Sequence, residues 1–290
     1  MELADIYTVI LNWNSYELTS SCLKSFPDVL LMNTIIVDNA SSDGSFVELE
    51  SKFPNCHFIR NEINFGFAKG NNIGIECALN RGAEYVLIIN NDVEVEHNFL
   101  FPLVSYLENH LEVAAVSPLI YHHPEKSKVW FSGGSVEMPT FFTKHNLLKI
   151  SEPCDTGFLT GCCILFRSSI LKTVGLFNEK FFAYFEDVDL SLRILHTNHK
   201  LVVVPESVIY HKVSQSFKKG DSIRSPLTFY LTIRNGIFLR RIHAHGNLAI
   251  SIVSYLLFSL KYILGFLFLL RFDHLRKSLR GIIDGFKGKL

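Results

Sequence analysis

Hydrophobic runs typical of buried strands alternate with amphipathic, helix-like stretches along the first part of the chain. The runs interpreted as strands are residues 7–12, 34–38, 56–60, 85–90 and 113–118. Helices are expected between them, and one opens with the capping-box sequence SFVE at residues 45–48. Because strands that alternate with helices form βαβ units, the pattern predicts an α/β fold with a mostly parallel sheet flanked by helices.

The pattern becomes less regular after residue 120. Residues 120–155 are rich in turn-forming residues, and we expect a hairpin around residues 129–138 and a mobile loop near 139–150. The alternation resumes with a strand-like run at residues 161–167, a helix that begins near residue 186 and a hydrophobic run at residues 200–212.

Polar residues stand where four of the predicted strands end. The four groups are Asn12 with Asn14, Asp38 with Asn39, Asn64 with Gly66 and Gly70, and Asn90 with Asn91 and Asp92. The carboxyl ends of parallel strands meet at one edge of a sheet, where ligands bind, so these groups predict a polar crevice. The glycine-rich stretch GFAKGNNIG has neither the GxGxxG order nor a GKS or GKT sequence, which argues against P-loop and dinucleotide fingerprints.

The stretch VLIINNDVEV, residues 86–95, ends a hydrophobic run on two amides and a carboxylate. A strand-end carboxylate such as Asp92 is a hard ligand that suits Mg²⁺ or Mn²⁺ holding a diphosphate. A turn-forming Asn-Asp pair accounts for the same residues equally well. His211, at the end of the run SVIYHK, is interpreted as structural unless the fold brings it to Asp92 as a second metal ligand.

A second acidic cluster lies in the stretch YFEDVDLSLR, after an aromatic run. Glu186 and Asp187 are expected at the start of a helix, where the helix dipole favours an ionised carboxylate. An ionised carboxylate in aromatic surroundings suits a general base acting on a sugar hydroxyl. Acidic residues are also common at helix N-termini without any catalytic role, so this alternative stays open. Asp189 and Arg193 have i,i+4 spacing and are expected to pair.

Composition reveals a separate hydrophobic region near the C-terminal end. Of 290 residues 48% are hydrophobic, and 28 basic residues balance 28 acidic ones. The hydrophobic excess lies at residues 247–270, which are about long enough to span a bilayer but are interrupted by Lys261. Because basic residues flank this stretch on both sides, we expect a monotopic helix or re-entrant hairpin rather than a span. A helix pair buried in a homodimer is the alternative.

Charge and cysteine usage indicate the compartment. From Arg271 onward six Lys and Arg residues stand against two acidic residues, which indicates an anionic membrane surface as a partner, and no nucleic acid is expected. The six cysteines show no CxxC and no zinc spacing, and Cys162 and Cys163 lie in an apolar run, so buried free thiols are expected. The first residues lack the order of a secretory signal, which favours the cytoplasmic face of the plasma membrane.

Six sequence motifs carry a resemblance to a known family. They are VILNWN, IIVDNASSDGS, NFGFAKGNNIG, IINNDVEV, GCCILFRSSILKTVGLFNEKFFAYFEDVDLSLR and YHKVSQS. Their order and spacing over about residues 5–240 resemble family 2 glycosyltransferases of the GT-A fold, most closely the rhamnosyltransferase-like branch. We therefore expect a GT-A domain at residues 1–225 and a helical, membrane-associating region with a basic tail at residues 226–290.

The resemblance implies roles for individual residues. Asp38 would hydrogen-bond the nucleotide base, with the backbone near Asn12 lining the same pocket. The residues implied beside the ribose, the diphosphate and the sugar are Asn64, Gly66, Lys69 and Asn91. Asp92 would be the last acid of the metal motif, with His211 completing the site for Mg²⁺ or Mn²⁺. Asp187 would be the general base, and Glu186 would position the acceptor. The usual Asp-x-Asp motif reads Asn90-Asn91-Asp92 here, so one carboxylate replaces two.

The expected activity is an inverting transfer of a sugar from a nucleotide-diphosphate donor, without a covalent enzyme intermediate. Rhamnose from dTDP-rhamnose is favoured, with a lipid-linked or polysaccharide acceptor in bacterial cell-surface polysaccharide synthesis. Two other classes are compared with this one. A nucleotidyltransferase should carry a basic phosphate-binding loop near the N-terminus, which LNWNSYELTS does not supply. A non-catalytic sugar-nucleotide-binding scaffold should tolerate the substitution Asp187→Asn.

Overall fold

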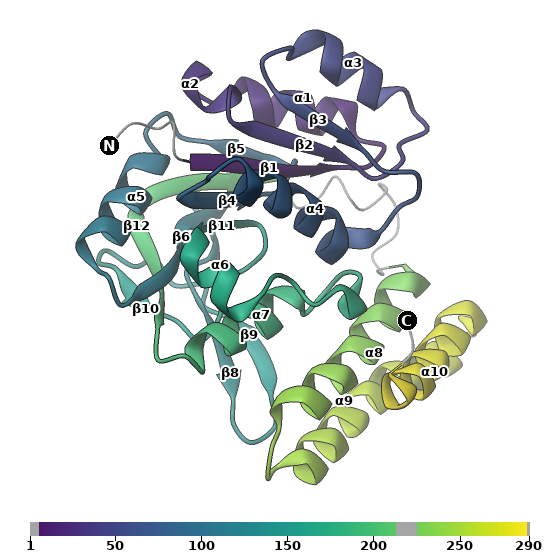
Figure 1. Cartoon of the computed structure of the whole chain (residues 1–290). Coiled ribbons are helices and arrows are strands. Elements are labelled where there is room, and N and C mark those ends of the chain that lie inside the picture. Colours follow the sequence, from purple (N-terminus) through teal and green to yellow (C-terminus); the bar gives the residue numbers. More distant parts are fainter. Residues whose placement is uncertain (1–5, 213–224, 289–290) are drawn as a thin grey trace.

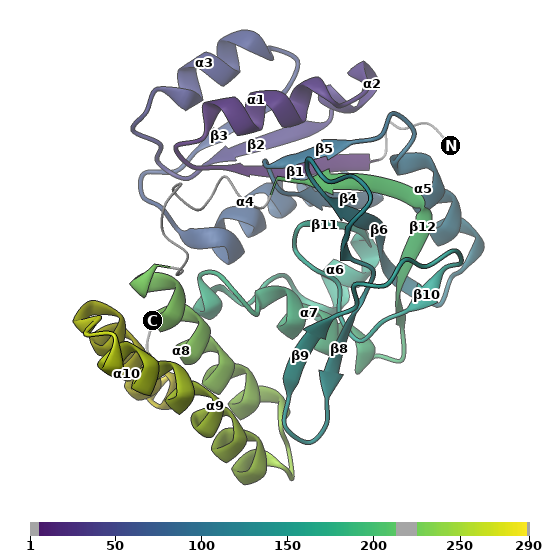
Figure 2. The same ribbon diagram turned by 180° about the vertical axis from the view of Figure 1, so that it is seen from behind.

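The predicted alternation forms one α/β sheet with helices on both faces (Figures 1 and 2). The computed structural model describes residues 6–212 and 225–288, so the last part of the motif YHKVSQS lies outside the described residues. The sheet has ten strands in the order β10-β12-β6-β11-β4-β1-β2-β3, with β5 paired to β12 and β7 paired to β6. The strands are β1 (Ile6–Asn12), β2 (Thr34–Asp38), β3 (His57–Arg60), β4 (Tyr85–Ile89), β5 (Val93–Val95), β6 (Val113–His122), β7 (Val129–Phe131), β10 (Cys154–Asp155), β11 (Cys163–Arg167) and β12 (Lys200–His211).

The sheet is mixed, although the sequence pattern predicted a mostly parallel one. The neighbours β4, β1, β2 and β3 are parallel, as the βαβ pattern requires. β11, in contrast, runs antiparallel to both β4 and β6. A parallel neighbour needs a crossover connection, usually a helix, and the described segment between β6 and β11 contains none. The chain therefore returns to the sheet in the opposite direction.

Helices cover the parallel part of the sheet on both sides. α1 (Tyr16–Lys24), α2 (Asp28–Leu31) and α3 (Ser45–Lys52) lie on one face, and α4 (Gly66–Asn80) lies on the other (Figure 1). The remaining helices of this part are α5 (Leu100–Asn109), α6 (Ser168–Val174), the short 3₁₀ helix η2 (Glu179–Phe181) and α7 (Glu186–Leu195). A Cβ atom at Gly70 would lie 2.5 Å from Leu11 Cδ1, and one at Gly74 would lie 2.4 Å from Val9 Cγ1. These glycines of GFAKGNNIG therefore let α4 pack closely on β1.

Two local predictions were wrong. α3 forms as expected, but its N-cap is Gly44, with φ +84°, and not the serine of a capping box. The hydroxyl of Ser45 instead accepts a hydrogen bond from Asn12 Nδ2 at 3.0 Å. The side chain expected to cap the helix is therefore engaged by a residue distant in the sequence. The expected mobile loop near residues 139–150 contains a strand, β9 (Phe142–His145), which pairs with β8 (Gly134–Glu137) in a separate two-stranded sheet.

Three helices follow the sheet domain. They are α8 (Pro226–His243), α9 (Leu248–Phe268) and α10 (Phe272–Lys287), and α8 lies against α7 and the tip of the β8–β9 hairpin (Figure 2). α10 packs on α8 through small residues, because Cβ atoms at Gly281 and Gly285 would lie 2.8 and 2.9 Å from the carbonyl oxygens of Tyr230 and Arg234.

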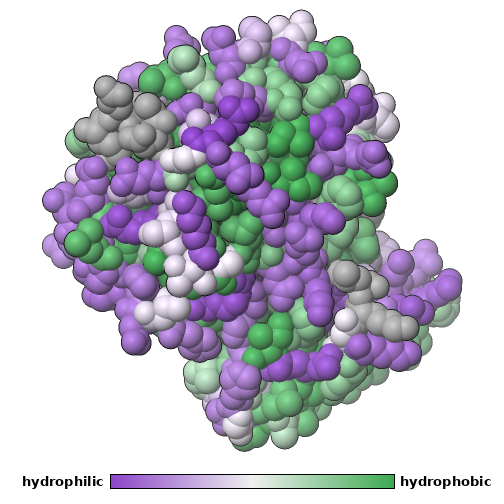
Figure 3. All heavy atoms as spheres, viewed as in Figure 1, coloured by the Kyte–Doolittle hydropathy of each residue, from purple (hydrophilic) through white to green (hydrophobic). Residues whose placement is uncertain are grey.

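α9 remains largely uncovered. Its length and mean hydropathy of 1.8 are sufficient for a membrane span, and 28% of its most apolar stretch is buried in the protein. Ser251, Tyr255, Ser259 and Ile263 form the inward-facing side, whereas Lys261 is exposed. In Figure 3, hydrophobic residues gather at the lower edge of the molecule, over the C-terminal helices.

Candidate functional site

The polar ends of the first, second and fourth strands meet in one hydrogen-bond network. Asn91 Nδ2 donates to Thr19 Oγ1 at 2.8 Å, and Thr19 Oγ1 donates to Asn12 Oδ1 at 2.7 Å. Asn12 Nδ2 in turn donates to Asp38 Oδ1 at 2.8 Å. The paired register Asn12↔Asp38 of β1 and β2 places the last two residues side by side. The predicted convergence of polar residues at this edge is therefore confirmed.

Asp38 stabilises the turn that follows β2. Its side chain is fully buried, and Oδ2 accepts a hydrogen bond from the amide of Ser41 at 2.9 Å, while Oδ1 accepts from Asn12. Ser41 Oγ accepts from the amide of Asn14 at 2.8 Å, which ties the ends of β1 and β2 together. Each oxygen retains capacity for a further donor, but the full burial of Asp38 leaves no surface for a nucleotide base to reach it directly.

The third strand end forms the entrance to α4. Asn64 Oδ1 accepts a hydrogen bond from the amide of Gly66 at 2.8 Å, and Asn39 Nδ2 donates to the carbonyl of Gly66 at 2.9 Å. Gly66 has φ +78°, and a Cβ atom there would lie 2.5 Å from the carbonyl oxygen of Phe182. Lys69 is 41% exposed and lies 3.9 Å from a carboxylate oxygen of Glu179. Its charged group is therefore accessible on the first turn of α4.

Asp92 and His211 come together although they are far apart in the sequence. The antiparallel pairing of β5 with β12 places His211 opposite Val93, and His211 Nε2 lies 3.1 Å from Asp92 Oδ1. Both side chains are buried. The contact lacks hydrogen-bond geometry, so Asp92 Oδ1 has no hydrogen-bond partner among the described residues. The other ring nitrogen of His211, Nδ1, also lacks one there.

This donor set fits a divalent cation with incomplete protein coordination. Asp92 supplies a carboxylate oxygen and His211 an imidazole nitrogen, and no third His, Cys, Asp or Glu within residues 6–212 and 225–288 completes a metal-binding group. Mn²⁺ accepts such oxygen-rich, partly nitrogen coordination more readily than Mg²⁺, which prefers oxygen ligands and retains water. The two residues therefore fit a cation whose other ligands come from substrate and solvent.

The second acidic cluster is connected to the same strand end through the loop before β11. Asp187 Oδ2 accepts a hydrogen bond from the amide of Gly161 at 3.0 Å, and Oδ1 accepts from the amide of Val188 at 2.8 Å. The carbonyl of Cys162, adjacent to Gly161, accepts from the amide of Asn90 at 2.9 Å. The loop before β11 therefore joins Asp187 to the Asn90-Asn91-Asp92 motif.

Glu186 and Asp187 differ in their surroundings. Burial raises the pKa of Glu186 well above its usual range, the charge of Asp187 raises it further, and Glu186 Oε2 has no hydrogen-bond partner among the described residues. Burial also raises the pKa of Asp187, but the amides of Gly161 and Val188 oppose this effect. Asp187 is therefore the carboxylate that ionises first. For Glu186, burial acts against the ionised form that a helix start would otherwise favour.

The backbone before these acids is strained. Phe182 has φ +62° and ψ −61°, and the amide of Ala183 donates to the carbonyl of Phe181 at 2.7 Å, which makes a γ-turn of the rare positive-φ type. Tyr184 and Phe185 follow with φ of +72° and +73°. Such conformations cost non-glycine residues about 1–3 kcal/mol each. The surrounding structure must therefore hold this segment in place.

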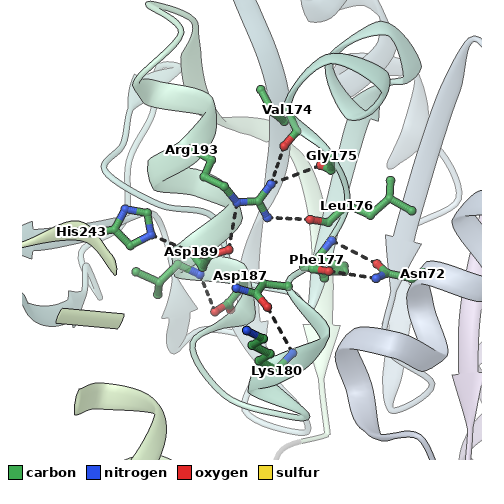
Figure 4. A network of polar contacts seen from close by, with 12 residues as sticks. Asn72, Val174, Gly175, Leu176, Phe177, Lys180, Asp187, Asp189, Arg193 and His243 are labelled. Atoms are coloured by element: carbon green, nitrogen blue, oxygen red, sulfur yellow. Dashed lines mark hydrogen bonds and ion pairs between the residues drawn. The ribbon is translucent and has the colours of Figure 1, made fainter. Parts of the chain in front are cut away.

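Asp189 connects α7 to its neighbours (Figure 4). Arg193 Nε donates to Asp189 Oδ2 at 2.9 Å, which confirms the expected i,i+4 pair, and His243 Nε2 of α8 lies 2.8 Å from Asp189 Oδ1. The Arg193 guanidinium also donates to the carbonyls of Val174 and Leu176 at 2.7 and 2.6 Å. These contacts fix α7, and with it the position of the two acids at its start.

Sequence reasoning missed two groups near the acids. The His145 ring packs against Trp130, Phe131 and Phe158 at centroid distances of 5.4, 5.0 and 5.8 Å. Partial burial among these rings lowers the pKa of His145, and the negative charge of Asp187 opposes this shift. Trp130 also contacts His211 at 4.3 Å. The irregular pattern of residues 120–155 gave no signal for this placement.

Lys212 is the second missed group. Its amide donates to the carbonyl of Asp92 at 2.8 Å, and its buried side chain donates to Ser21 Oγ at 2.7 Å. The sequence YHK at the end of β12 contained the signal, because a lysine directly follows the histidine. Lys212 brings a positive charge to the side of Asp92.

Comparisons with known proteins agree with this arrangement. The family model described as Glycosyl transferase family 2 matches residues 8–175. The chain is similar to the dTDP-rhamnosyl transferase RfbF of Shigella flexneri, with 22% identity over 98% of this chain and 96% of that protein. It is also similar to the N-acetylglucosaminyl-diphospho-decaprenol L-rhamnosyltransferase of Mycobacterium tuberculosis, with 26% identity over 64% of this chain and 68% of that protein.

A solved structure supports the fold. GalNAc-T7, crystallised with UDP, GalNAc and Mn²⁺, superimposes with a TM-score of 0.66 and 18% identity. The match covers 83% of this chain and 48% of that chain. At this identity the likeness shows the fold alone.

Proposed function

Because the chain belongs to glycosyl transferase family 2 and is rhamnosyltransferase-like, we propose that it transfers rhamnose from dTDP-rhamnose to a lipid-linked acceptor with inversion at the anomeric carbon. The acceptor class follows the printed name of the mycobacterial relative, whose substrate is a diphospho-decaprenol. A polysaccharide acceptor in cell-surface polysaccharide synthesis is the broader form of the same proposal.

The observation that carries the proposal is the meeting of two acidic groups at one sheet edge. Asp92 follows β4, and His211, the last residue of β12, contacts it. Asp187 is joined to the end of β4 through Gly161, Cys162 and Asn90. A group that holds a diphosphate and a group that removes a proton are both required for direct displacement at a sugar carbon. Because the two groups come from different elements, β4 with β12 for one and α7 for the other, they suit attack from the face opposite the leaving group.

Asp187 acts as the general base in this proposal. Its two amide contacts favour the ionised form, while Glu186 remains protonated and hydrogen-bonds the acceptor as a donor. A single carboxylate that ionises above the usual Asp range is well matched to deprotonating a hydroxyl during attack. The aromatic side chains of Trp130 and Phe158 limit access of water, which would otherwise hydrolyse the donor.

The donor occupies the strand ends. Asp92 and His211 hold Mn²⁺ or Mg²⁺, and Lys69 and Lys212 add positive charge toward the diphosphate. The cation, when bound, neutralises charge that develops on the departing diphosphate. Asn91 is fixed by Thr19 beside the sugar, and Asn64 and Gly66 shape the entrance for the ribose. Asp38 and Asn12 set the turn that receives the nucleotide base.

The C-terminal helices support a position at the cytoplasmic face of the membrane. α9 exposes apolar side chains along most of its length, and basic residues of α10 such as Arg276 and Lys277 flank it. Apolar area and positive charge together favour binding to an anionic bilayer surface. We assign residues 226–290 to this membrane-associating unit and residues 1–225 to the transferase domain, with a monotopic arrangement rather than a span.

The test is donor binding and turnover by the purified chain in detergent. The donors are dTDP-rhamnose, UDP-glucose, UDP-galactose, UDP-N-acetylglucosamine and GDP-mannose, each with Mn²⁺, Mg²⁺ or EDTA, and turnover is followed as nucleotide release. We expect dTDP-rhamnose to bind, Asp92→Ala to weaken binding, and Asp187→Asn to bind normally without turnover. Asp155→Asn, which alters an exposed carboxylate paired with Lys200, is the control and should match wild type.

Two results would contradict this proposal. Binding of another donor in place of dTDP-rhamnose would overturn the choice of rhamnose and leave the roles of Asp92 and Asp187 intact. Undiminished nucleotide release by Asp187→Asn would refute the assignment of Asp187 as general base and would show that this carboxylate has no catalytic role.

A further inference from the structure

We propose that Arg234 and Asn235 of α8 are positioning residues that hold the strained 181–185 segment in the conformation that presents Asp187 to the acceptor. The inference rests on the proposed function, because it takes Asp187 as the base. It assigns a catalytic consequence to the C-terminal helices, which otherwise have only a membrane role.

Asn235 is the main support of the segment. It is fully buried, and its Nδ2 atom lies 2.8, 2.7 and 2.8 Å from the carbonyl oxygens of Phe181, Ala183 and Tyr184. Carbonyls turned inward by positive-φ residues have no regular secondary structure to satisfy them. With two N–H groups for three carbonyls, one of these hydrogen bonds is shared, and a single amide of α8 contacts the carbonyls of Phe181, Ala183 and Tyr184.

Arg234 fixes that amide and extends the support. Its Nε donates to Asn235 Oδ1 at 2.8 Å, which sets the orientation of the amide. Its Nη2 donates to the carbonyls of Lys180 and Phe181 at 3.0 and 2.8 Å. The guanidinium fork can make these contacts simultaneously, whereas a lysine ammonium, as a single point, cannot. The two neighbouring residues of α8 therefore act as one unit.

The opposite side of the segment contacts the first turn of α4, next to the proposed donor-binding residues Asn64 and Gly66. The carbonyl of Phe182 accepts hydrogen bonds from the amides of Phe67 and Ala68, at 2.6 and 3.1 Å, in the first turn of α4. The absence of a side chain at Gly66 permits this approach. The segment is thus held between the donor-binding entrance on one side and α8 on the other. Displacement of α8 would shift Asp187 relative to the bound donor.

Side chains of α8 also hold the β8–β9 hairpin. Arg240 donates to the carbonyls of Thr140 and Phe141 at 3.1 and 2.9 Å, and β9 of the same hairpin ends at His145, whose pKa is influenced by the charge of Asp187. His243 contacts Asp189 in the same helix as Asp187. α8 therefore contacts the surroundings of the base at three points. Arg234 and Asn235 form the first and hold the segment that leads directly into Asp187, while Arg240 and His243 form the other two.

The test compares Asn235→Ala and Arg234→Lys with Arg241→Lys. Arg241 lies on the same helix and donates to the carbonyl of Gly285 in α10 at 2.9 Å, so its substitution removes a similar contact away from the 181–185 segment. Purified proteins in detergent are assayed for dTDP-rhamnose affinity, for dTDP release per folded molecule and for the pH dependence of that release. Thermal unfolding measures the folded fraction.

We expect Asn235→Ala and Arg234→Lys to lower kcat by about 10- to 100-fold with donor affinity changed less than about threefold, because a misplaced base slows chemistry and not binding. The acid limb of the kcat profile should move to lower pH, since a loosened segment admits water to Asp187. Arg241→Lys should match wild type in donor affinity, in kcat and in the pH profile of kcat. Arg234→Lys keeps the positive charge and most of the side-chain volume, so it is informative even where Asn235→Ala does not fold.

The inference is overturned if kcat per folded molecule and the pH profile of both variants equal those of Arg241→Lys. That result, together with an inactive Asp187→Asn, would leave the proposed base intact and limit Arg234 and Asn235 to stability. If Asp187→Asn itself turns over normally, the proposed base fails, and the positioning role fails with it.

Discussion

His211 Nε2 lies 3.1 Å from Asp92 Oδ1 at the carboxyl end of β4, and both side chains are buried. A buried carboxylate oxygen without a hydrogen-bond donor is costly unless a ligand completes its surroundings. This contact is therefore the structural basis for proposing a cation at this site.

Substitution of either member of this pair should weaken donor binding only when the cation is present. We expect Asp92→Asn and His211→Ala to raise the dissociation constant for the donor about 10- to 100-fold in Mn²⁺. In EDTA the variants and wild type should bind equally weakly, as titration calorimetry would measure. Glu94→Gln is the control, because Glu94 lies on the neighbouring β5 and pairs with Lys126 at 2.7 Å. Equal losses in Mn²⁺ and EDTA would exclude a metal role.

Glu186→Gln should stabilise the protein increasingly as the pH rises. The folded protein retains the proton on Glu186 over a pH range in which the unfolded chain has lost it, because burial raises this pKa. Stability therefore falls as pH rises above the usual Glu pKa and continues to fall until the folded-state pKa is reached. The variant lacks this loss, so its advantage should grow by at most about 1.4 kcal/mol per pH unit and vanish near pH 4.

Urea unfolding between pH 4 and pH 9 measures this difference. The exposed Glu50, replaced by Gln, serves as the matched control and should show no such pH-dependent gain. A constant difference between Glu186→Gln and wild type across this range would contradict the raised pKa.

Gly285→Ala should loosen α10 from α8. The new methyl group would meet the carbonyl oxygen of Arg234 at 2.9 Å, and overpacking of this kind costs about 1–3 kcal/mol. Gly265→Ala in α9 is the control, because no atom lies within 4 Å of the added methyl group and alanine favours helix by about 0.5–1 kcal/mol. Thermal unfolding should therefore move in opposite directions for the two variants, and a matching shift would refute the close helix contact.

Charges placed on the open face of α9 should release the protein from anionic vesicles. Leu257 and Leu264 are 64% and 53% exposed, and each buried leucine contributes about 1.5–3 kcal/mol. We expect Leu257→Glu and Leu264→Glu each to reduce co-sedimentation with phosphatidylglycerol vesicles at least about tenfold. Leu111→Glu, on a leucine that is 79% exposed outside the helical unit, should bind as wild type does. Equal binding by all variants would leave the apolar face of α9 to a homodimer contact.

The sequence was most informative where structure depends on neighbouring residues. Alternation of hydrophobic and polar positions located β1 to β4 and their helices, and residues at strand ends identified the edge where Asn12, Asp38 and Asn91 meet. These features follow from periodicity and from the direction of parallel strands, which are local properties. The Asp189–Arg193 pair was predictable for the same reason, since helix geometry alone brings i and i+4 together.

Tertiary structure decided what local rules cannot express. The Ser45 hydroxyl of SFVE binds Asn12 and does not cap α3, the expected loop near residue 142 forms β9, and burial raises the pKa of Glu186 at the start of α7. Each outcome depends on a partner distant in the sequence or on removal from water, and neither is encoded in the spacing of nearby residues. The sequence alone determined which residue types stand at the strand ends. Folding decided which of them touch, and it placed α8 against the segment before Asp187.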